Sequence, residues 1–200
     1  MRILRAEGRH AAPWSNGGGV TREVAVQPPG AGWDTFAWRV SLADVTRDGP
    51  YSPLPGVRRI LTVVDGAGLE LTVDGVPRLL PERYRPFAFP GGAATGSRLL
   101  DGPVVNLNVM LREGRAAATV EMVRGCRAVR QADDGTAGPD EVLVVAVEGC
   151  TRIGAPGAHE AQLERFDAAL LTAPDAAAAE LWTEGTAAVI ALSATGVDRL

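Results

Sequence analysis

Lysine is absent from this chain of 200 residues, so its 20 positively charged side chains are all arginines. They are scattered along the sequence and are outnumbered by 24 Asp and Glu residues, which leaves a net charge of −4. Proteins that bind nucleic acids or anionic lipids usually concentrate positive charge in one run or on one surface. We therefore expect neither a nucleic acid nor a membrane as a partner.

Side chains that bind metals or act as nucleophiles are scarce. The chain has two histidines, His10 and His159, and two cysteines, Cys126 and Cys150, whose spacing matches no metal motif. It also lacks a Gly-x-Ser-x-Gly nucleophile motif. We therefore expect no metal, no cofactor and no nucleophilic catalysis. Both cysteines are expected to be buried thiols, with a disulfide between them as the alternative.

Long hydrophobic runs are missing too. No segment approaches the apolar length that spans a membrane, and Met1 to Arg5 lack the apolar core of a signal peptide. A cytoplasmic location is therefore expected. Hydrophobic residues make up 46% and charged residues 22% of the chain, which suits one large or two small globular domains.

Short patterns typical of β-strands recur along the sequence. Each either alternates apolar and polar residues or forms a brief apolar run, and several end next to a Gly turn signal. They occupy residues 36–44, 59–64, 69–74, 105–111, 141–147 and 186–192. Residues 175–180 could form a short helix capped by Asp175, or a surface connection. With 24 Gly and 14 Pro in the connections, the pattern predicts an all-β sandwich or barrel.

An internal similarity relates the two halves of the chain. Equivalent residues lie 83 or 84 positions apart, namely Gly66 and Gly149, Leu79 and Leu163, and Pro90 and Pro174. Two hairpins can look alike by chance, but a matched offset over a long stretch favours a duplication. We therefore predict two similar small β-barrels, residues 1–115 and residues 116–200.

The two halves differ in one strand. Asn106 and Asn108 share a face of the strand at residues 105–111 with Met110, whereas the matching strand at residues 187–192 has no polar face. A strand that is apolar on both faces is packed on both sides, and a polar face borders water or a ligand. We therefore expect the first barrel to be hollow and to contain the site, and the second to be packed and structural.

Arg39 and Ser41 are candidates for the same interior. In residues 36–44 they point away from the apolar face of the predicted strand. Their face is either solvated, which is the usual case, or lines the barrel beside Asn106 and Asn108. An inward Arg suits a carboxylate, because its planar guanidinium can donate two parallel hydrogen bonds.

Two loops rich in Gly or Pro are further candidates. Residues 48–59 form a rigid segment, which suits either a barrel mouth that contacts a ligand or a plain connection. Residues 13–24, PWSNGGGVTREV, contain three consecutive glycines but lack the Lys-Ser/Thr of a phosphate-binding loop. We expect this segment to cross a barrel mouth with Asn16 and either Arg22 or Glu23 pointing inward.

Three stretches resemble the HutD/Ves family of bacterial proteins, namely residues 13–24, residues 36–71 and residues 106–112 (NLNVMLR). The similarity covers residues 1 to about 112 well and the rest weakly. It implies a bicupin, two small β-barrels in one chain. Like the family, this sequence lacks the His-x-His and Glu metal pattern of most cupins. The family often accompanies histidine utilisation and has been proposed to bind formimino- or formylglutamate in a regulatory role.

The resemblance also extends to individual positions. Residues that match the family's motifs are Trp14, Asn16, Gly17, Gly18, Thr21, Arg22, Glu23, Arg39, Ser41, Asp48, Gly49, Ser52, Arg59, Asn108 and Met110. Two positions depart from its pattern: the family usually has Lys where Ser15 stands and often Asp where Asn106 stands.

Residues and resemblance together predict a non-catalytic cytoplasmic bicupin whose first barrel binds a small acidic metabolite. Arg39 and Arg59 are expected to hold its carboxylate. The predicted ligand-binding residues are Trp14, Asn16, Arg22, Glu23, Arg39, Ser41, Ser52, Arg59, Asn106 and Asn108. One alternative is a metal-independent hydrolase, isomerase or lyase with Glu23 or Asp48 as general base. The other is a structural module that forms a homodimer through exposed strand edges.

Overall fold

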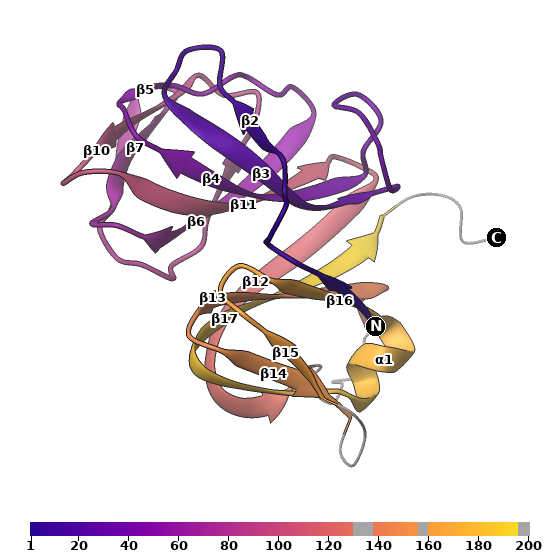
Figure 1. Ribbon diagram of the computed structural model, residues 1–200. Helices are drawn as coiled ribbons and strands as arrows, with labels where there is room; N and C mark the ends of the chain where they lie inside the picture. Colours follow the sequence, from indigo (N-terminus) through magenta and orange to yellow (C-terminus); the bar gives the residue numbers. More distant parts are fainter. Residues whose placement is uncertain (130–137, 156–159, 196–200) are drawn as a thin grey trace. The chain divides into compact units, whose positions relative to one another are not determined.

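A computed structural model of the chain describes residues 1–129, 138–155 and 160–195. These residues are almost entirely in β-strands, and the chain divides into two compact units (Figure 1). The first unit is Arg9–Arg115 and the second combines Met1–Gly8 with Ala116–Leu200. The all-β fold predicted from the sequence is therefore correct.

The first unit consists of two sheets. The larger has the strand order β2 (Ala11–Pro13), β3 (Gly19–Gln27), β4 (Trp38–Val45), β11 (Val104–Arg112), β6 (Val57–Asp65) and β9 (Phe87–Pro90). The smaller has the order β5 (Gly49–Pro50), β10 (Thr95–Leu99), β7 (Leu69–Val73) and β8 (Val76–Leu80). The four strands predicted in this unit are all present, with ends shifted by at most two residues.

An apolar core fills part of the space between these two sheets. It brings together side chains from both of them, including Leu61 and Val63 of β6 and Leu69 and Leu71 of β7. Tyr51, from the Pro-rich loop, belongs to the same cluster. One part of the interior of the first unit is therefore packed. Beside it, one face of β4, β6 and β11 carries a polar stripe that consists of Arg39, Ser41, Arg59, Asn106 and Asn108.

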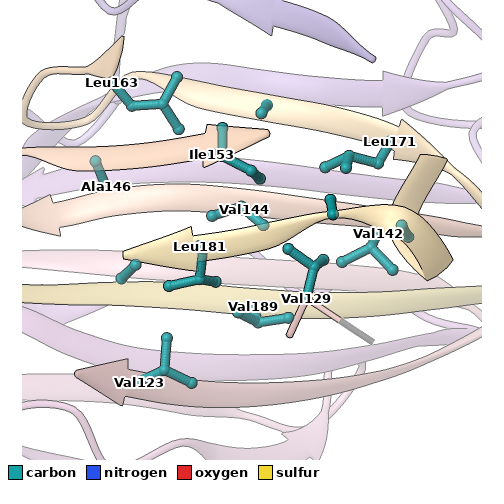
Figure 2. Close-up of a cluster of buried hydrophobic side chains, with 14 residues drawn as sticks. Val123, Val129, Val142, Val144, Ala146, Ile153, Leu163, Leu171, Leu181 and Val189 are labelled. Atoms are coloured by element: carbon teal, nitrogen blue, oxygen red, sulfur yellow. The ribbon is translucent and has the colours of Figure 1, made fainter. Parts of the chain in front are cut away.

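The second unit is built on a single sheet. Its order is β1 (Arg2–Leu4), β16 (Ala168–Thr172), β13 (Glu141–Glu148), β17 (Glu180–Ala194), β14 (Thr151–Gly154) and β15 (Ala161–Leu163), and β12 (Ala116–Ala128) also pairs with β17. Side chains from most of these strands meet in one apolar cluster, which Figure 2 shows in close-up. Val144, Ile153 and Leu163 are completely buried there.

The strand pairing repeats between the units. In the first, β11 lies between β4 and β6, and β6 also pairs with β9. In the second, β17 lies between β12 and β13, and β13 also pairs with β16. This shared order supports the duplication inferred from the sequence.

The first eight residues differ from the expected domain division. The sequence predicts them in the first barrel, but β1 pairs with β16, with Arg2 opposite Leu170. Ile3 packs against the apolar cluster of the second unit, and Arg5 forms an ion pair with Asp167 at 2.7 Å. These contacts join residues that are far apart in sequence, so no local pattern indicated them.

In the second unit, the short helix that was one of two alternatives is present with a different cap, and the expectation of two buried thiols is wrong. The helix α1 spans Ala173–Ala178 with Thr172 as its N-cap residue, so Asp175 lies in the first turn instead of at the cap. Cys126, on β12, is exposed instead of buried. Cys150 is half-buried, and both thiols are free.

Among the residues that the structure describes, no helix is long and apolar enough to cross a membrane.

Candidate functional site: a polar cavity in the first unit

The strand register of the first unit places its polar side chains on one face. Asn108 on β11 lies between Ser41 of β4 and Leu61 of β6. Met110, two residues further along, lies between Arg39 and Arg59. Directly opposed residues of antiparallel strands project to the same face of a sheet. The sequence-predicted polar residues of these three strands therefore share one surface.

This surface borders a cavity of about 460 Å³. The lining residues are Ala12, Pro13, Trp14, Ser15, Asn16, Thr21, Trp33, Ser41, Ala43, Pro50, Tyr51, Ser52, Leu54, Arg59, Asn108 and Met110. Six predicted site residues belong to this set: Trp14, Asn16, Ser41, Ser52, Arg59 and Asn108. The other four, Arg22, Glu23, Arg39 and Asn106, are not in it. The cavity's size and its mostly apolar wall with a few polar groups are typical of a small-molecule site.

Arg59 is the charged group of the cavity, and it is only 7% exposed. Its guanidinium lies 5.1 Å from the ring centre of Tyr51 and 5.3 Å from that of Phe89. In the described part of the chain, no carboxylate lies within 4.0 Å of it, and its buried Nε has no hydrogen-bond partner. Burial lowers the pKa of Arg59, although an arginine remains protonated at neutral pH. Among the residues that the structure describes, Arg59 is therefore a buried cation without a carboxylate counterion.

Tyr51 forms the wall beside Arg59, and the sequence did not single it out. Its hydroxyl accepts a hydrogen bond from Nδ2 of Asn106 at 3.5 Å, and its ring packs edge-on against Trp14 at 5.7 Å. Burial raises the pKa of the Tyr51 phenol, against the opposing effect of the Arg59 charge. At neutral pH the phenol is therefore uncharged and does not neutralise Arg59.

Two amide oxygens near the same stripe lack donors. Asn106 and Asn108 are 1% and 6% exposed, and in both the buried Oδ1 atom has no hydrogen-bond partner. Leaving a buried polar atom unpaired costs about 1–3 kcal/mol. Native proteins accept such costs mainly where a ligand or another function requires the group.

The glycine-rich loop closes on itself and on neighbouring backbone. Oδ1 of Asn16 accepts a hydrogen bond from the Gly18 amide at 2.9 Å, and its Nδ2 donates to the Pro50 carbonyl at 3.2 Å. Gly17 has a φ of 67°, which favours glycine. A Cβ on Gly19 would lie 2.2 Å from the backbone oxygen of Asp44. The glycines thus allow a tight turn and close strand pairing, and the loop places Trp14 and Asn16 at the cavity.

The structure gives Arg39 contacts other than a ligand clamp. Its guanidinium pairs with Glu23 at 3.1 Å, donates to the Ala31 carbonyl at 2.7 Å and stacks over the Trp33 ring at 4.4 Å. Arg39 therefore supports the loop that presents Trp33 to the cavity.

Arg22 forms an ion pair with Asp44. Glu23, and not Arg22, shares the face of Arg39, because β3 has a bulge between Glu23 and Ala25.

The two proposed general bases also lie outside the cavity lining. Glu23 is held by Arg39, and Oδ1 of Asp48 accepts a hydrogen bond from the Leu99 amide at 2.7 Å. In residues 1–129, 138–155 and 160–195, no cluster of three or more His, Cys, Asp or Glu side chains could hold a metal ion.

Two β units with the same strand pairing in one chain fit a bicupin fold, and the cavity described above is a candidate site in the first of them. A family model described as HutD matches residues 6–190, and the chain belongs to the HutD family. The family resemblance noted from the sequence motifs is thus confirmed.

Relatives and solved structures agree with this assignment. A protein of Pseudomonas putida described as an uncharacterised 21.2 kDa protein in the hutC 3′ region is 38% identical over 127 residues, or 62% of this chain. Protein Ves of Citrobacter koseri is 35% identical over 112 residues, or 54% of this chain. These matches cover only 65% and 56% of the two relatives.

The structural matches extend over nearly the whole chain. HutD from Pseudomonas fluorescens SBW25, solved in a formate condition, superposes with a TM-score of 0.79 and 31% identity, covering 98% of this chain and 99% of that one. A cupin 2 conserved barrel domain protein from Leptotrichia buccalis superposes with a TM-score of 0.54 and 11% identity, covering 88% of each chain. The second match concerns the fold alone and supports its cupin character.

Proposed function

We propose that this protein is a binding protein for a small acidic metabolite, with the cavity of the first unit as its site. The observation behind the proposal is Arg59, a nearly buried guanidinium that has no carboxylate partner among the described residues. A buried charge is costly unless it is paired. A ligand carboxylate would supply the missing partner and accept hydrogen bonds from the guanidinium.

The neighbouring groups suit the rest of such a ligand. Asn108 and Ser41 offer amide and hydroxyl groups from adjacent strands, and Trp14, Leu54 and Met110 offer apolar surface. Directional polar groups within an apolar wall fix the orientation of a small molecule.

A glutamate derivative, such as formyl- or formiminoglutamate, is the ligand that the family resemblance suggests. The name HutD of the solved relative and the hutC 3′ region of the Pseudomonas putida relative support a link with histidine utilisation. In this proposal the protein acts in regulation of that pathway and does not catalyse a step. Catalysis has less support, because neither Glu23 nor Asp48 lines the cavity.

Isothermal titration calorimetry with formyl- and formiminoglutamate, repeated on Arg59→Met, tests the proposal. The wild type should bind at least one of them, and Arg59→Met should bind at least about tenfold more weakly, because the charge-assisted hydrogen bonds are lost. Ligand at about a hundred times its Kd should also stabilise the wild type by ~2.7 kcal/mol.

Arg58→Met is the matched control. Arg58 is the preceding residue on β6, with an exposed side chain, and it does not line the cavity. This control should retain wild-type affinity. Equal affinity of Arg59→Met and wild type, or no binding to the wild type by any acid in a wider panel, would contradict the proposal.

A further inference from the structure

The charge of the cavity is of one sign. Among the residues that line it, all of them within the described range 9–115, Arg59 alone is ionised at neutral pH. Tyr51 is the other titratable side chain there, and burial raises its pKa and keeps it neutral. The polar remainder consists of neutral amides and hydroxyls, such as those of Asn108, Ser41 and Thr21. The site can therefore neutralise a negative charge but has no group to neutralise a positive one.

The acid on the same sheet face does not change this balance. Glu23 lies opposite Ser41 in the register of β3 and β4, but its carboxylate is paired with Arg39 at 3.1 Å. Arg39 is itself held by the Ala31 carbonyl and by the Trp33 ring. An ammonium group of a ligand would have to compete with Arg39 for Glu23, and the release of Arg39 would disturb the support of Trp33.

We propose that the cavity selects acids that carry no cationic group, so that it binds N-acylated or deaminated acids and rejects the corresponding free amino acids. This inference rests on the proposed function and specifies its ligand class. A ligand ammonium would lose water in a site that offers it no anion, and it would be repelled by Arg59. Specificity of this kind comes from an unfavourable interaction with the wrong ligand.

The same reasoning separates two ligands of nearly identical shape. The formyl group of formylglutamate is a neutral amide, whereas the formimino group of formiminoglutamate is an amidine that is protonated at neutral pH. The amide can accept and donate hydrogen bonds with Asn108 and Ser41, both of which lie in the cavity wall. A second carboxylate can be accommodated at the rim, where Ser15, Asn16 and Ser52 are exposed.

Calorimetry with a matched series of four ligands tests this selectivity on the wild-type protein. Glutarate has no nitrogen, formylglutamate has a neutral amide, and glutamate and formiminoglutamate each have a cationic group. We expect the first two to bind, and the last two to bind at least about tenfold more weakly, or ~1.4 kcal/mol. Binding of glutamate within threefold of formylglutamate would overturn the inference and leave the proposed function intact. Binding of none of the four, nor of any other acid, would overturn both.

A carboxylate introduced into the cavity wall provides a second test of the selectivity for ligand charge. Asn108→Asp places a carboxylate in the wall with little change in shape, and should reverse the order so that glutamate binds more tightly than formylglutamate. Gln27→Glu is the control, because it makes the same chemical change on β3 away from the cavity lining. It should retain the wild-type order.

A second variant guards against misfolding of Asn108→Asp. Ser52 lines the cavity from an exposed loop, so Ser52→Asp should fold and should move the order in the same direction by a smaller factor. An unchanged order in every folded cavity variant would overturn the inference, because an added anion would then have no influence on ligand charge.

Discussion

The two units share the same strand pairing but carry different kinds of side chain at equivalent positions. Equivalent strands align so that the positions of Arg59 and Asn108 in the first unit correspond to those of Val142 and Val189 in the second. Asn106 corresponds in the same way to Ala187. The second unit is filled at these positions by one apolar cluster, whereas in the first they carry a cation and two amides next to a cavity.

Unpaired polar atoms follow the same division. Within the described residues, every buried side-chain nitrogen or oxygen without a hydrogen-bond partner belongs to the first unit. In the second unit, Thr151 and Thr183 bond to each other at 3.0 Å, and Asp167 is bonded by Arg5 and by the Ala6 amide. The scaffold itself therefore does not require unpaired groups. Of these residues of the first unit, Arg59 and Asn108 line the cavity, where an unpaired group is available to a ligand.

The largest effect on stability is expected when one polar residue of the first unit is introduced at the equivalent position of the second unit. Val189→Asn places in the apolar cluster the residue that the first unit has at the equivalent position, and should lower the free energy of unfolding by about 3 kcal/mol. Chemical denaturation measures the loss, and hydrogen exchange should localise it to β13 and β17. Thr119→Asn, at an exposed site on β12, should change stability by less than about 0.5 kcal/mol. A similar loss in both variants would contradict the contrast between the units.

A smaller effect on stability is expected when the carboxylate of Asp167 in the second unit is removed. Burial alone would raise the pKa of Asp167, but hydrogen bonds from the Ala6 amide, Arg5 and the Glu164 amide hold it below its ordinary value. The folded form therefore binds the proton less readily than the unfolded form. The resulting stabilisation is present at neutral pH and is lost as pH falls below about 4, the ordinary Asp value.

Asp167→Asn should accordingly lower stability by about 1–2 kcal/mol at pH 7, and it should flatten the fall in stability between about pH 5 and pH 2. Denaturation midpoints measured across this range provide the test. Asp101→Asn, at an exposed loop position of the first unit, is the control and should keep the wild-type profile. An unaltered acid profile for Asp167→Asn would show that the paired acid does not contribute.

The smallest change in stability is expected from the reverse exchange in the first unit. Asn108→Val removes an amide oxygen that has no donor, so stability should remain within about 1 kcal/mol of wild type or rise slightly. Ligand affinity should nevertheless fall at least about tenfold, because a hydrogen-bonding group of the cavity is lost. Denaturation and calorimetry on the same preparation separate the two effects. A loss of more than about 2 kcal/mol would indicate that the amide has a structural role instead.

Much of the fold could be predicted because its signals are local. Alternation located β4, β6, β7 and β11, and the Asp74-Gly75 hairpin turn has positive φ at both residues, as that turn type requires. The matched offset between the halves indicated the duplication. The pairing of β1 with β16 was missed because a strand of three residues has no detectable period.

The lining of the candidate site was predicted in part, and the residues that were missed have physical causes. Ser41 and Asn108 follow from strand alternation, and Trp14, Asn16 and Ser52 from family motifs. The pairing of Arg39 with Glu23 depends on the bulge in β3, which shifts the face of Glu23 relative to a regular strand and leaves no mark in the sequence pattern. Tyr51 lies in a loop, where no periodicity states which way a side chain points. Its place beside Ser52 in the Pro-rich segment was the only available signal.

The strand β17 has a consequence for the order in which the chain can fold during synthesis. The first unit has all its residues once Arg115 has left the ribosome, and no strand of its two sheets is made later. The sheet of the second unit joins Met1–Gly8 to strands that follow Arg115, and β17, which pairs with β12, β13 and β14, is made after all the other strands of that sheet. β1 therefore has no partner until β16 has been made, and a chain that stopped before β17 would keep every residue of the first unit while lacking the strand on which the sheet of its duplicate depends.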